Sequence, residues 1–125
     1  MDYRPCAVCG GVGTERHHVI PRSHCRALIH CEKNLVVLCP RCHRGRNGVH
    51  QNRELDLKLK LEFQNELEML FDKEYLTEDD IQQTLGISDR AMKSLSKTLK
   101  KERDGTYSRE SVIISCMGGR LYGDS

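Results

Sequence analysis

Two pairs of cysteines carry the clearest chemistry in this chain of 125 residues. Cys6 and Cys9 are separated by two residues, and so are Cys39 and Cys42. Together they supply four thiolates, the ligand set that a tetrahedral zinc ion prefers, and the two-residue spacing lets each pair wrap one side of the ion. The sequence therefore predicts a closed, structural zinc site that holds the N-terminal part of the chain together.

Histidines lie between these cysteine pairs and directly after the second one. His17 and His18 are adjacent in a segment that is predicted to be a short strand, and His43 follows Cys42. Because neighbouring side chains on a strand point to opposite faces, one imidazole of the pair can face a metal while the other faces a substrate. Since zinc would bring the two cysteine pairs together, we expect His43 to lie near this strand.

The segments "ERHHVIP" (15–21) and "NLVVLCPRCH" (34–43), with the flanking cysteine pair, resemble the HNH or ββα-metal endonucleases. The likeness is to the small four-cysteine zinc form that is common in bacteriophages. The intervals fit, with sixteen residues from His18 to Asn34 and nine from Asn34 to His43. The resemblance implies an α+β fold with a zinc-stabilised nuclease domain over residues 1–52. It also implies a phage or mobile-element protein that hydrolyses DNA phosphodiester bonds.

The resemblance further implies roles for individual residues. His18 would be the general base, and Asn34 would hold the loop and orient the His18 ring. His17 and His43 would bind a catalytic divalent ion, Mg²⁺ or another metal, which is distinct from the structural zinc. This second site would keep open positions for substrate, whereas the four-cysteine site is closed.

The third ligand of the catalytic ion has two candidates. Family members often carry it four residues after the position of His43, where this chain has Asn47. His50 would serve instead if Gly45 and Gly48 form an insertion, and we favour His50. The departure at Asn47 also favours an alternative function, a non-catalytic zinc-stabilised DNA-binding regulator.

Charge is distributed unevenly along the chain. Residues 1–50 carry a net charge of +5, residues 51–82 carry −6 and residues 83–125 carry +3. Basic residues around the cysteine and histidine motifs would attract phosphate irrespective of base sequence, and we assign Arg44 and Arg46 to DNA contact. The odd count of seven cysteines, the polar N-terminus and the lack of a membrane-spanning apolar run predict a cytoplasmic protein, in the host cytoplasm if phage-encoded.

Residues 53–75 are predicted to form a connecting helix. Leucines alternate with period two at the start of this segment, as in a strand, but apolar residues also form one helical stripe. The segment is longer than a normal strand, lacks β-branched residues and is rich in helix formers, so we predict a helix. The stripe consists of Leu55, Leu59, Phe63, Leu67, Leu70 and Phe71.

The last segment, residues 76–125, resembles a helix-turn-helix. Thr77 and Ser88 are suited to cap two helices, with Gly86 in the turn between them. The second helix, expected from Asp89 to Lys101, would offer basic side chains to DNA. The alternative is a plain helical hairpin that packs on the nuclease domain or on a second copy in a homo-oligomer. The basic side chains assigned to DNA contact are Arg90, Lys93 and Lys97.

Overall fold

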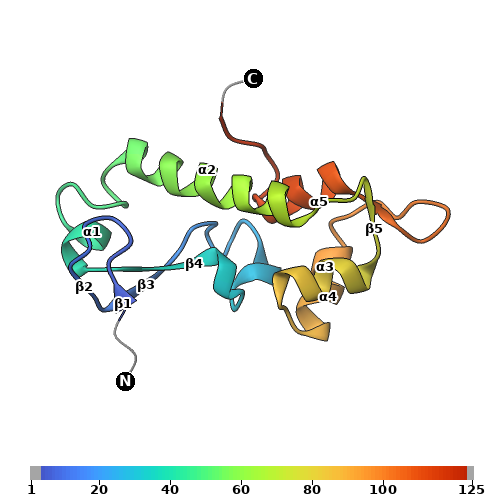
Figure 1. The fold of residues 1–125 in the computed structure, drawn as a ribbon, viewed down its shortest axis with the longest axis horizontal. Helices are drawn as coiled ribbons and strands as arrows, with labels where there is room; N and C mark the ends of the chain where they lie inside the picture. The colour runs from blue at the N-terminus through green and yellow to red at the C-terminus, as the bar shows by residue number, and fades with distance from the viewer. Residues whose placement is uncertain (1–3, 124–125) are drawn as a thin grey trace.

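The computed structural model describes residues 4–123 as an elongated α+β fold (Figure 1). A long helix, α2 (Arg53–Leu70), runs along the molecule. The N-terminal strands and the short helix α1 (Pro40–Arg44) lie under its first half, and the remaining helices lie at its other end. The predicted α+β class is confirmed.

Two antiparallel strand pairs form the N-terminal part. Strand β1 (Arg4–Pro5) pairs with β2 (Val12–Gly13), and β3 (Glu15–His18) pairs with β4 (Leu35–Leu38). The chain then turns directly into α1, whose first residue is a proline, as helix N-termini favour. Strands β3 and β4 with α1 therefore form a compact ββα unit.

The loop between β3 and β4 contains two single-turn helices. They are η1 (Arg26–Leu28) and η2 (Glu32–Asn34). Ile20 and Leu28 from this loop are fully buried, so the loop contributes to the core, while other residues of the loop are exposed. A loop with buried backbone requires internal hydrogen-bond partners, which Asn34 supplies as described below.

Helix α2 forms as the apolar stripe predicts, but it is shorter than the expected range. The Asn52 side chain caps it by accepting a hydrogen bond from the Leu55 N–H at 3.2 Å. The middle of the stripe turns inward, whereas Leu55 is half-buried and Leu70 is exposed, and the helix ends after Leu70. The next residues leave the helix because Tyr75–Leu76 form strand β5, which pairs with β6 (Tyr107–Ser108). The buried apolar residues of α2 are Leu59, Phe63 and Leu67.

Two short helices follow, separated by a glycine turn. Helix α3 (Glu78–Leu85) starts with a capping box in which Thr77 and Asp80 bind each other's backbone N–H groups. Gly86 ends it with a φ of 65°, a left-handed conformation that favours glycine. Helix α4 (Asp89–Ser96) starts at the Ser88 cap.

Helix α4 stops well before Lys101, so the expected length of the second helix is wrong. The hydroxyl of Ser96 donates to the carbonyl of Lys93, and that of Thr98 donates to the carbonyl of Leu95. Such side-chain bonds compete with the helical pattern of the backbone. The apolar run near the C-terminus forms helix α5 (Arg109–Cys116).

One continuous core joins the N-terminal part to the helices that follow α2. The thiol of Cys31 donates to the carbonyl of Leu85 at 3.3 Å, which ties the β3–β4 loop to the end of α3. The side chain of Gln64 on α2 binds both backbone groups of Tyr122, at 2.9 and 2.7 Å. The helical part is therefore packed against the N-terminal part and is not a tethered appendage.

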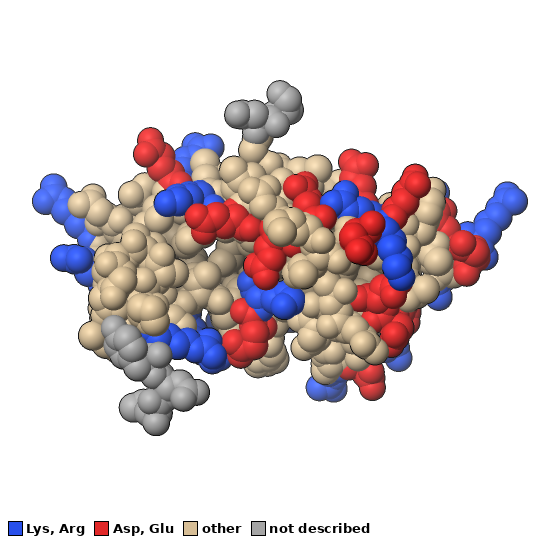
Figure 2. Space-filling model, in the orientation of Figure 1, with Lys and Arg blue, Asp and Glu red and all other residues tan. Residues whose placement is uncertain are grey.

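The surface mixes both signs of charge. On the face seen in Figure 2, acidic side chains lie along α2 and over the helical part, with Lys and Arg side chains between them and at both ends. Within residues 4–123, no helix combines the length and the apolar character that crossing a membrane requires.

Candidate active site

The four paired cysteines converge on one point. Their sulfur atoms all lie within 4.8 Å of one another, and those of Cys9 and Cys39 are 3.7 Å apart. Sulfur atoms bound tetrahedrally to one zinc ion lie about 3.8 Å apart, as follows from a Zn–S bond of about 2.3 Å. Backbone N–H groups of Gly11 and Cys42 each donate to a cluster sulfur at 3.4 Å. The cluster therefore fits a structural zinc ion.

The pKa values of the thiols in this cluster are shifted in opposite directions. Burial raises the pKa of Cys6, but backbone N–H groups, chiefly that of Cys9, lower it to about 6. At Cys42, burial and then the neighbouring thiol of Cys39 raise the pKa to about 12. Four negative sulfurs this close repel one another unless a cation lies among them. A bound divalent ion removes that conflict, which agrees with the zinc assignment.

The other three cysteines are buried away from this cluster. They are part of the core, and burial raises the pKa of each thiol. Within residues 4–123 they join no further group with metal-binding geometry. They are Cys25, Cys31 and Cys116.

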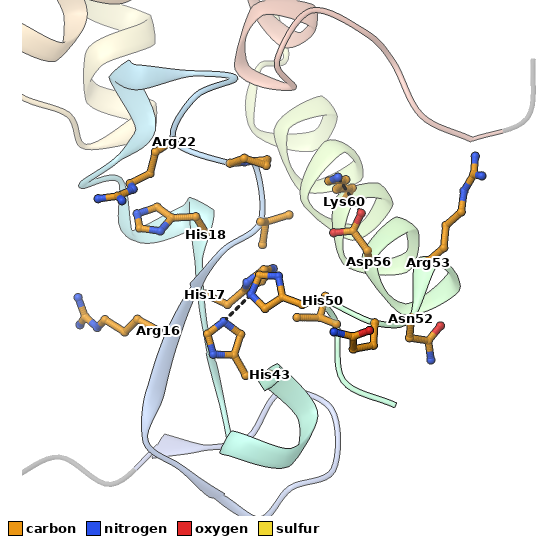
Figure 3. A pocket seen from close by; sticks show the side chains of 14 residues that line it. Arg16, His17, His18, Arg22, His43, His50, Asn52, Arg53, Asp56 and Lys60 are labelled. Atoms are coloured by element: carbon orange, nitrogen blue, oxygen red, sulfur yellow. Dashed lines mark hydrogen bonds and ion pairs between the residues drawn. The ribbon is translucent and has the colours of Figure 1, made fainter. Parts of the chain in front are cut away.

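Three histidines form a second cluster, on β3, on α1 and in the loop after α1. One ring nitrogen each from His17, His43 and His50 lies within 4.8 Å of the others. The Nε2 atoms of His43 and His50 are 3.0 Å apart. Figure 3 shows the three rings facing one another beside the start of α2. Three converging imidazoles with an open side are a donor set that suits a divalent transition metal or zinc.

His17 supplies a direct sign that this cluster fits a metal. Its side chain is buried, and among the described residues its Nε2 atom has no hydrogen-bond partner. Burial, followed by the nearby His50 and His43, lowers the pKa of His17 to about 4. The ring is therefore neutral at neutral pH. A buried unpaired nitrogen is costly unless it binds something, and a metal ion would satisfy it.

The chain brings His50 into the cluster through two glycines, whereas exposed Asn47 is not among the residues lining the pocket around it. A Cβ atom at Gly45 would lie 2.4 Å from the carbonyl oxygen of Arg41, and one at Gly48 would lie 2.8 Å from the same atom. Only glycine allows the loop to fold back this tightly against α1. The backbone N–H of His50 then donates to the carbonyl of His43 at 3.4 Å.

Glu15 is part of the site and was not predicted from the sequence. Its Oε1 atom accepts a hydrogen bond of 2.7 Å from Nδ1 of His43, and its carboxylate also pairs with Arg44. Arg44, followed by His43, holds the pKa of Glu15 below its usual range. A carboxylate behind a metal-binding histidine fixes the tautomer and points the other nitrogen toward the ion. The available signal was the spacing, because Glu15 lies two residues before His17 and so shares its face of the strand.

His18 lies on the opposite side of β3 from His17, as Figure 3 shows. Its Nε2 atom is 2.9 Å from the carbonyl oxygen of Ile29. A carbonyl only accepts, so Nε2 carries the hydrogen and Nδ1 keeps the lone pair in the neutral ring. The ring is thus held in one tautomer, with a basic nitrogen left for other partners.

Asn34 is fully buried and binds only backbone. Its amide oxygen accepts from the N–H of Ile20 at 2.7 Å, and its amide nitrogen donates to the carbonyls of Ile20 and Leu28 at 3.1 and 3.2 Å. Both amide N–H groups of Asn34 are thus used within the loop, and none of these three bonds reaches the His18 ring. It holds the loop that carries the Ile29 carbonyl, and that carbonyl orients His18.

The histidines line one pocket of about 710 Å³ between the ββα unit and the start of α2. Cationic side chains surround it, among them Arg22 from the loop and Arg53 from α2. Asp56 also lines the pocket but is paired with Lys60 at 2.7 Å. The pocket is therefore suited to an anionic ligand beside a metal ion.

The residues assigned to DNA contact do not gather in this pocket. Arg44 binds Glu15 and so supports His43, while Arg46 is exposed outside the pocket. Arg90, Lys93 and Lys97 are exposed on or at the end of α4, in the helical part.

A family model described as HNH endonuclease matches residues 6–48. This range contains both cysteine pairs and the ββα unit that carries His17, His18 and His43. Residues 6–48 are an HNH endonuclease domain. Members of this family are usually metal-dependent nucleases, and the histidine cluster is consistent with an active site. Comparisons with curated proteins and with solved structures found no match. His50 lies just beyond the matched range, so the structure adds it to the HNH domain.

Proposed function

We propose that this chain is a divalent-metal-dependent endonuclease that hydrolyses DNA phosphodiester bonds. One observation carries the proposal. His17, His43 and His50 converge in a pocket that is also lined by His18, whose ring is held in one tautomer by the Ile29 carbonyl. A nuclease of this kind needs a metal donor set and a separate, oriented base at the same phosphate.

Each group would have a distinct task. A divalent ion held by His17, His43 and His50 would neutralise charge on the scissile phosphate and stabilise the leaving oxygen. His18 would accept a proton from the attacking water at Nδ1, because Nε2 donates to Ile29. Glu15 would keep His43 in the tautomer with Nε2 free.

The substrate proposal follows from charge. Arg16, Arg22 and Arg53 line the histidine pocket, and exposed lysines on the helical part would extend the attraction along a polyanion. We assign DNA contact to the helix-turn-helix-like pair α3 and α4 as part of this proposal. The resemblance to phage proteins further supports a phage or mobile-element origin and action in the cytoplasm, where thiols stay reduced.

A plasmid-nicking assay tests the proposal. Purified zinc-loaded protein is incubated with supercoiled DNA, with no added ion, with Mg²⁺ and with Mn²⁺. Cleavage that depends on the added ion and is lost in His17→Ala supports the nuclease. Binding to the plasmid without cleavage under any ion would instead support a DNA-binding regulator.

A further inference from the structure

A second cavity, of about 530 Å³, lies between the β3–β4 loop of the HNH domain and the turn that joins α3 to α4. One wall comes from η1 and the residues after it, and the other comes from Gly86 to Ser94. Ala27 and Ile87, both buried, give it an apolar base. None of its lining residues lines the histidine pocket, so it is a separate site.

Ionisable side chains at this cavity are all basic. Arg26 and His30 come from the HNH domain and Arg90 comes from α4, and all three are exposed. Among residues 4–123, no acidic side chain lines the cavity. Within residues 4–123, these three side chains make no ion pair or hydrogen bond. Arg16 and Arg44, by contrast, are each paired with a glutamate.

Two unpaired guanidinium groups at one hollow favour a particular ligand. The planar fork of arginine matches the oxygens of phosphate and carboxylate and gives two parallel, charge-assisted hydrogen bonds. Two arginines from different elements can grip one tetrahedral anion from two sides. The Ser94 hydroxyl also lines the cavity and can donate to such an anion.

The cavity is connected to the histidine site through Ile29. The side of the loop that contains Ile29 and His30 lines the cavity, while the carbonyl of Ile29 accepts the hydrogen bond from His18. The loop residues Pro21 and Arg22 line the histidine pocket. One loop thus contributes residues to both sites, so DNA bound at the cavity would contact the same loop that lines the histidine pocket.

We propose that this cavity binds a phosphodiester group of the DNA that the histidine site cleaves, held by Arg26 and Arg90. The inference rests on the proposed nuclease function, because DNA is the ligand. Arg26 belongs to the HNH domain and Arg90 to α4, so both parts would hold the same DNA. The contact is to the phosphate backbone of the DNA and does not depend on base sequence. Helix α4 acts here through its N-terminal residues and not through its exposed lysines.

A double-mutant cycle tests this assignment. Full-length, zinc-loaded protein binds a labelled DNA duplex, without added divalent ion, over a range of salt concentrations. The variants are Arg26→Gln, Arg90→Gln and the double substitution, with Arg103→Gln as a control. Arg103 is exposed in the loop between α4 and β6, away from the cavity, and its loss removes the same charge.

We expect each single variant to weaken binding about tenfold and to lower the salt slope by about one, the effect of losing one phosphate contact. The double variant should be little worse than either single one, because both arginines hold the same phosphate and their effects are coupled. Arg103→Gln should leave affinity and slope close to those of the unsubstituted protein. Arg26→Lys and Arg90→Lys, which keep the charge, should recover most of the slope.

Two results would overturn the assignment. One is that Arg26→Gln and Arg90→Gln bind DNA as the Arg103→Gln control does, in protein whose melting temperature is unchanged. The other is that the double variant loses as much binding free energy as the two single variants together and lowers the salt slope by about two. That result would mean that Arg26 and Arg90 contact separate phosphates. Plasmid nicking by the unsubstituted protein is measured in parallel. Absence of nicking counts against the nuclease proposal, whereas the double-mutant cycle alone decides whether the cavity binds DNA.

Discussion

The carboxylate of Glu15 lies 2.7 Å from Nδ1 of His43 and so fixes the orientation of this imidazole in the histidine cluster. The same carboxylate pairs with Arg44, which keeps it negative. A negative partner strengthens the metal affinity of an imidazole and holds its orientation. Glu15 therefore belongs to the candidate site although it is not among the residues that line the pocket.

Replacing Glu15 tests this relationship. We expect Glu15→Ala to raise the concentration of Mn²⁺ or Mg²⁺ needed for half-maximal cleavage by about 10–100-fold, the usual effect of removing such a partner. Glu15→Gln keeps an acceptor for Nδ1 of His43. Its metal requirement should therefore lie between those of the unsubstituted protein and Glu15→Ala. The measurement is cleavage against metal concentration, with Glu62→Ala, at an exposed glutamate of α2, as the control. An unchanged metal requirement in Glu15→Ala would show that His43 needs no such support.

His18 should affect rate and hardly affect binding. We expect His18→Ala to lower the cleavage rate by about 10²- to 10⁴-fold, the typical contribution of a positioned general base. Affinity for DNA should stay similar, because the arginines around the pocket supply the phosphate attraction and remain in place. Rates are measured under single-turnover conditions. His24→Ala, at an exposed histidine in the same loop, is the control and should cleave normally. Normal cleavage by His18→Ala would refute its role as the base.

The four-cysteine cluster should bind zinc, and the bound zinc should stabilise the folded chain. We expect about one tightly held zinc ion per chain, and loss of both zinc and folded structure in Cys9→Ser or Cys39→Ser, because metal binding is coupled to folding in small domains. The measurements are metal analysis and thermal unfolding. Cys25→Ala, at a buried cysteine outside the cluster, should keep its zinc even where it melts earlier. Folded, reduced protein without zinc would contradict the site.

The lysines of α4 test the helix-turn-helix proposal independently of the second cavity. We expect Lys93→Ala with Lys97→Ala to weaken DNA binding and to reduce its salt slope by about one to two. Both side chains are exposed, so stability should not change. The measurement is affinity against salt, with the melting temperature recorded for each variant. An unchanged slope would favour the alternative in which α3 and α4 form a packed hairpin without DNA contact.

Much of the site could be predicted because its residues follow local rules. Alternation along a strand predicted that the side chains of His17 and His18 diverge. The two cysteine pairs, brought together by a zinc ion, predicted that His43 lies near them. The position of His50 depended on two glycines whose effect is seen only in three dimensions, since a Cβ atom at either would meet the Arg41 carbonyl. Sequence spacing therefore left both Asn47 and His50 open.

The tertiary contacts of the helical part could not be predicted. The caps at Thr77 and Ser88 and the turn at Gly86 were visible in the sequence because they depend on local hydrogen bonds and φ angles. The packing of α4 against η1, and the bond from the Cys31 thiol to the Leu85 carbonyl, join residues far apart in the chain. No local pattern specifies such a pair.

The adjacency of His17 and His18 makes the active site sensitive to strand alignment. In the observed pairing, His17 is opposite Val36 and His18 is opposite Leu35. A slip of β3 by one residue would exchange the two faces, so that His17 would turn outward and His18 would turn inward. The zinc cluster encloses this strand pair, since Cys6 precedes β3 and Cys39 directly follows β4. A zinc ion bound to the four cysteines would therefore hold β3 and β4 in this register, and its loss would disturb the alignment that separates His17 from His18.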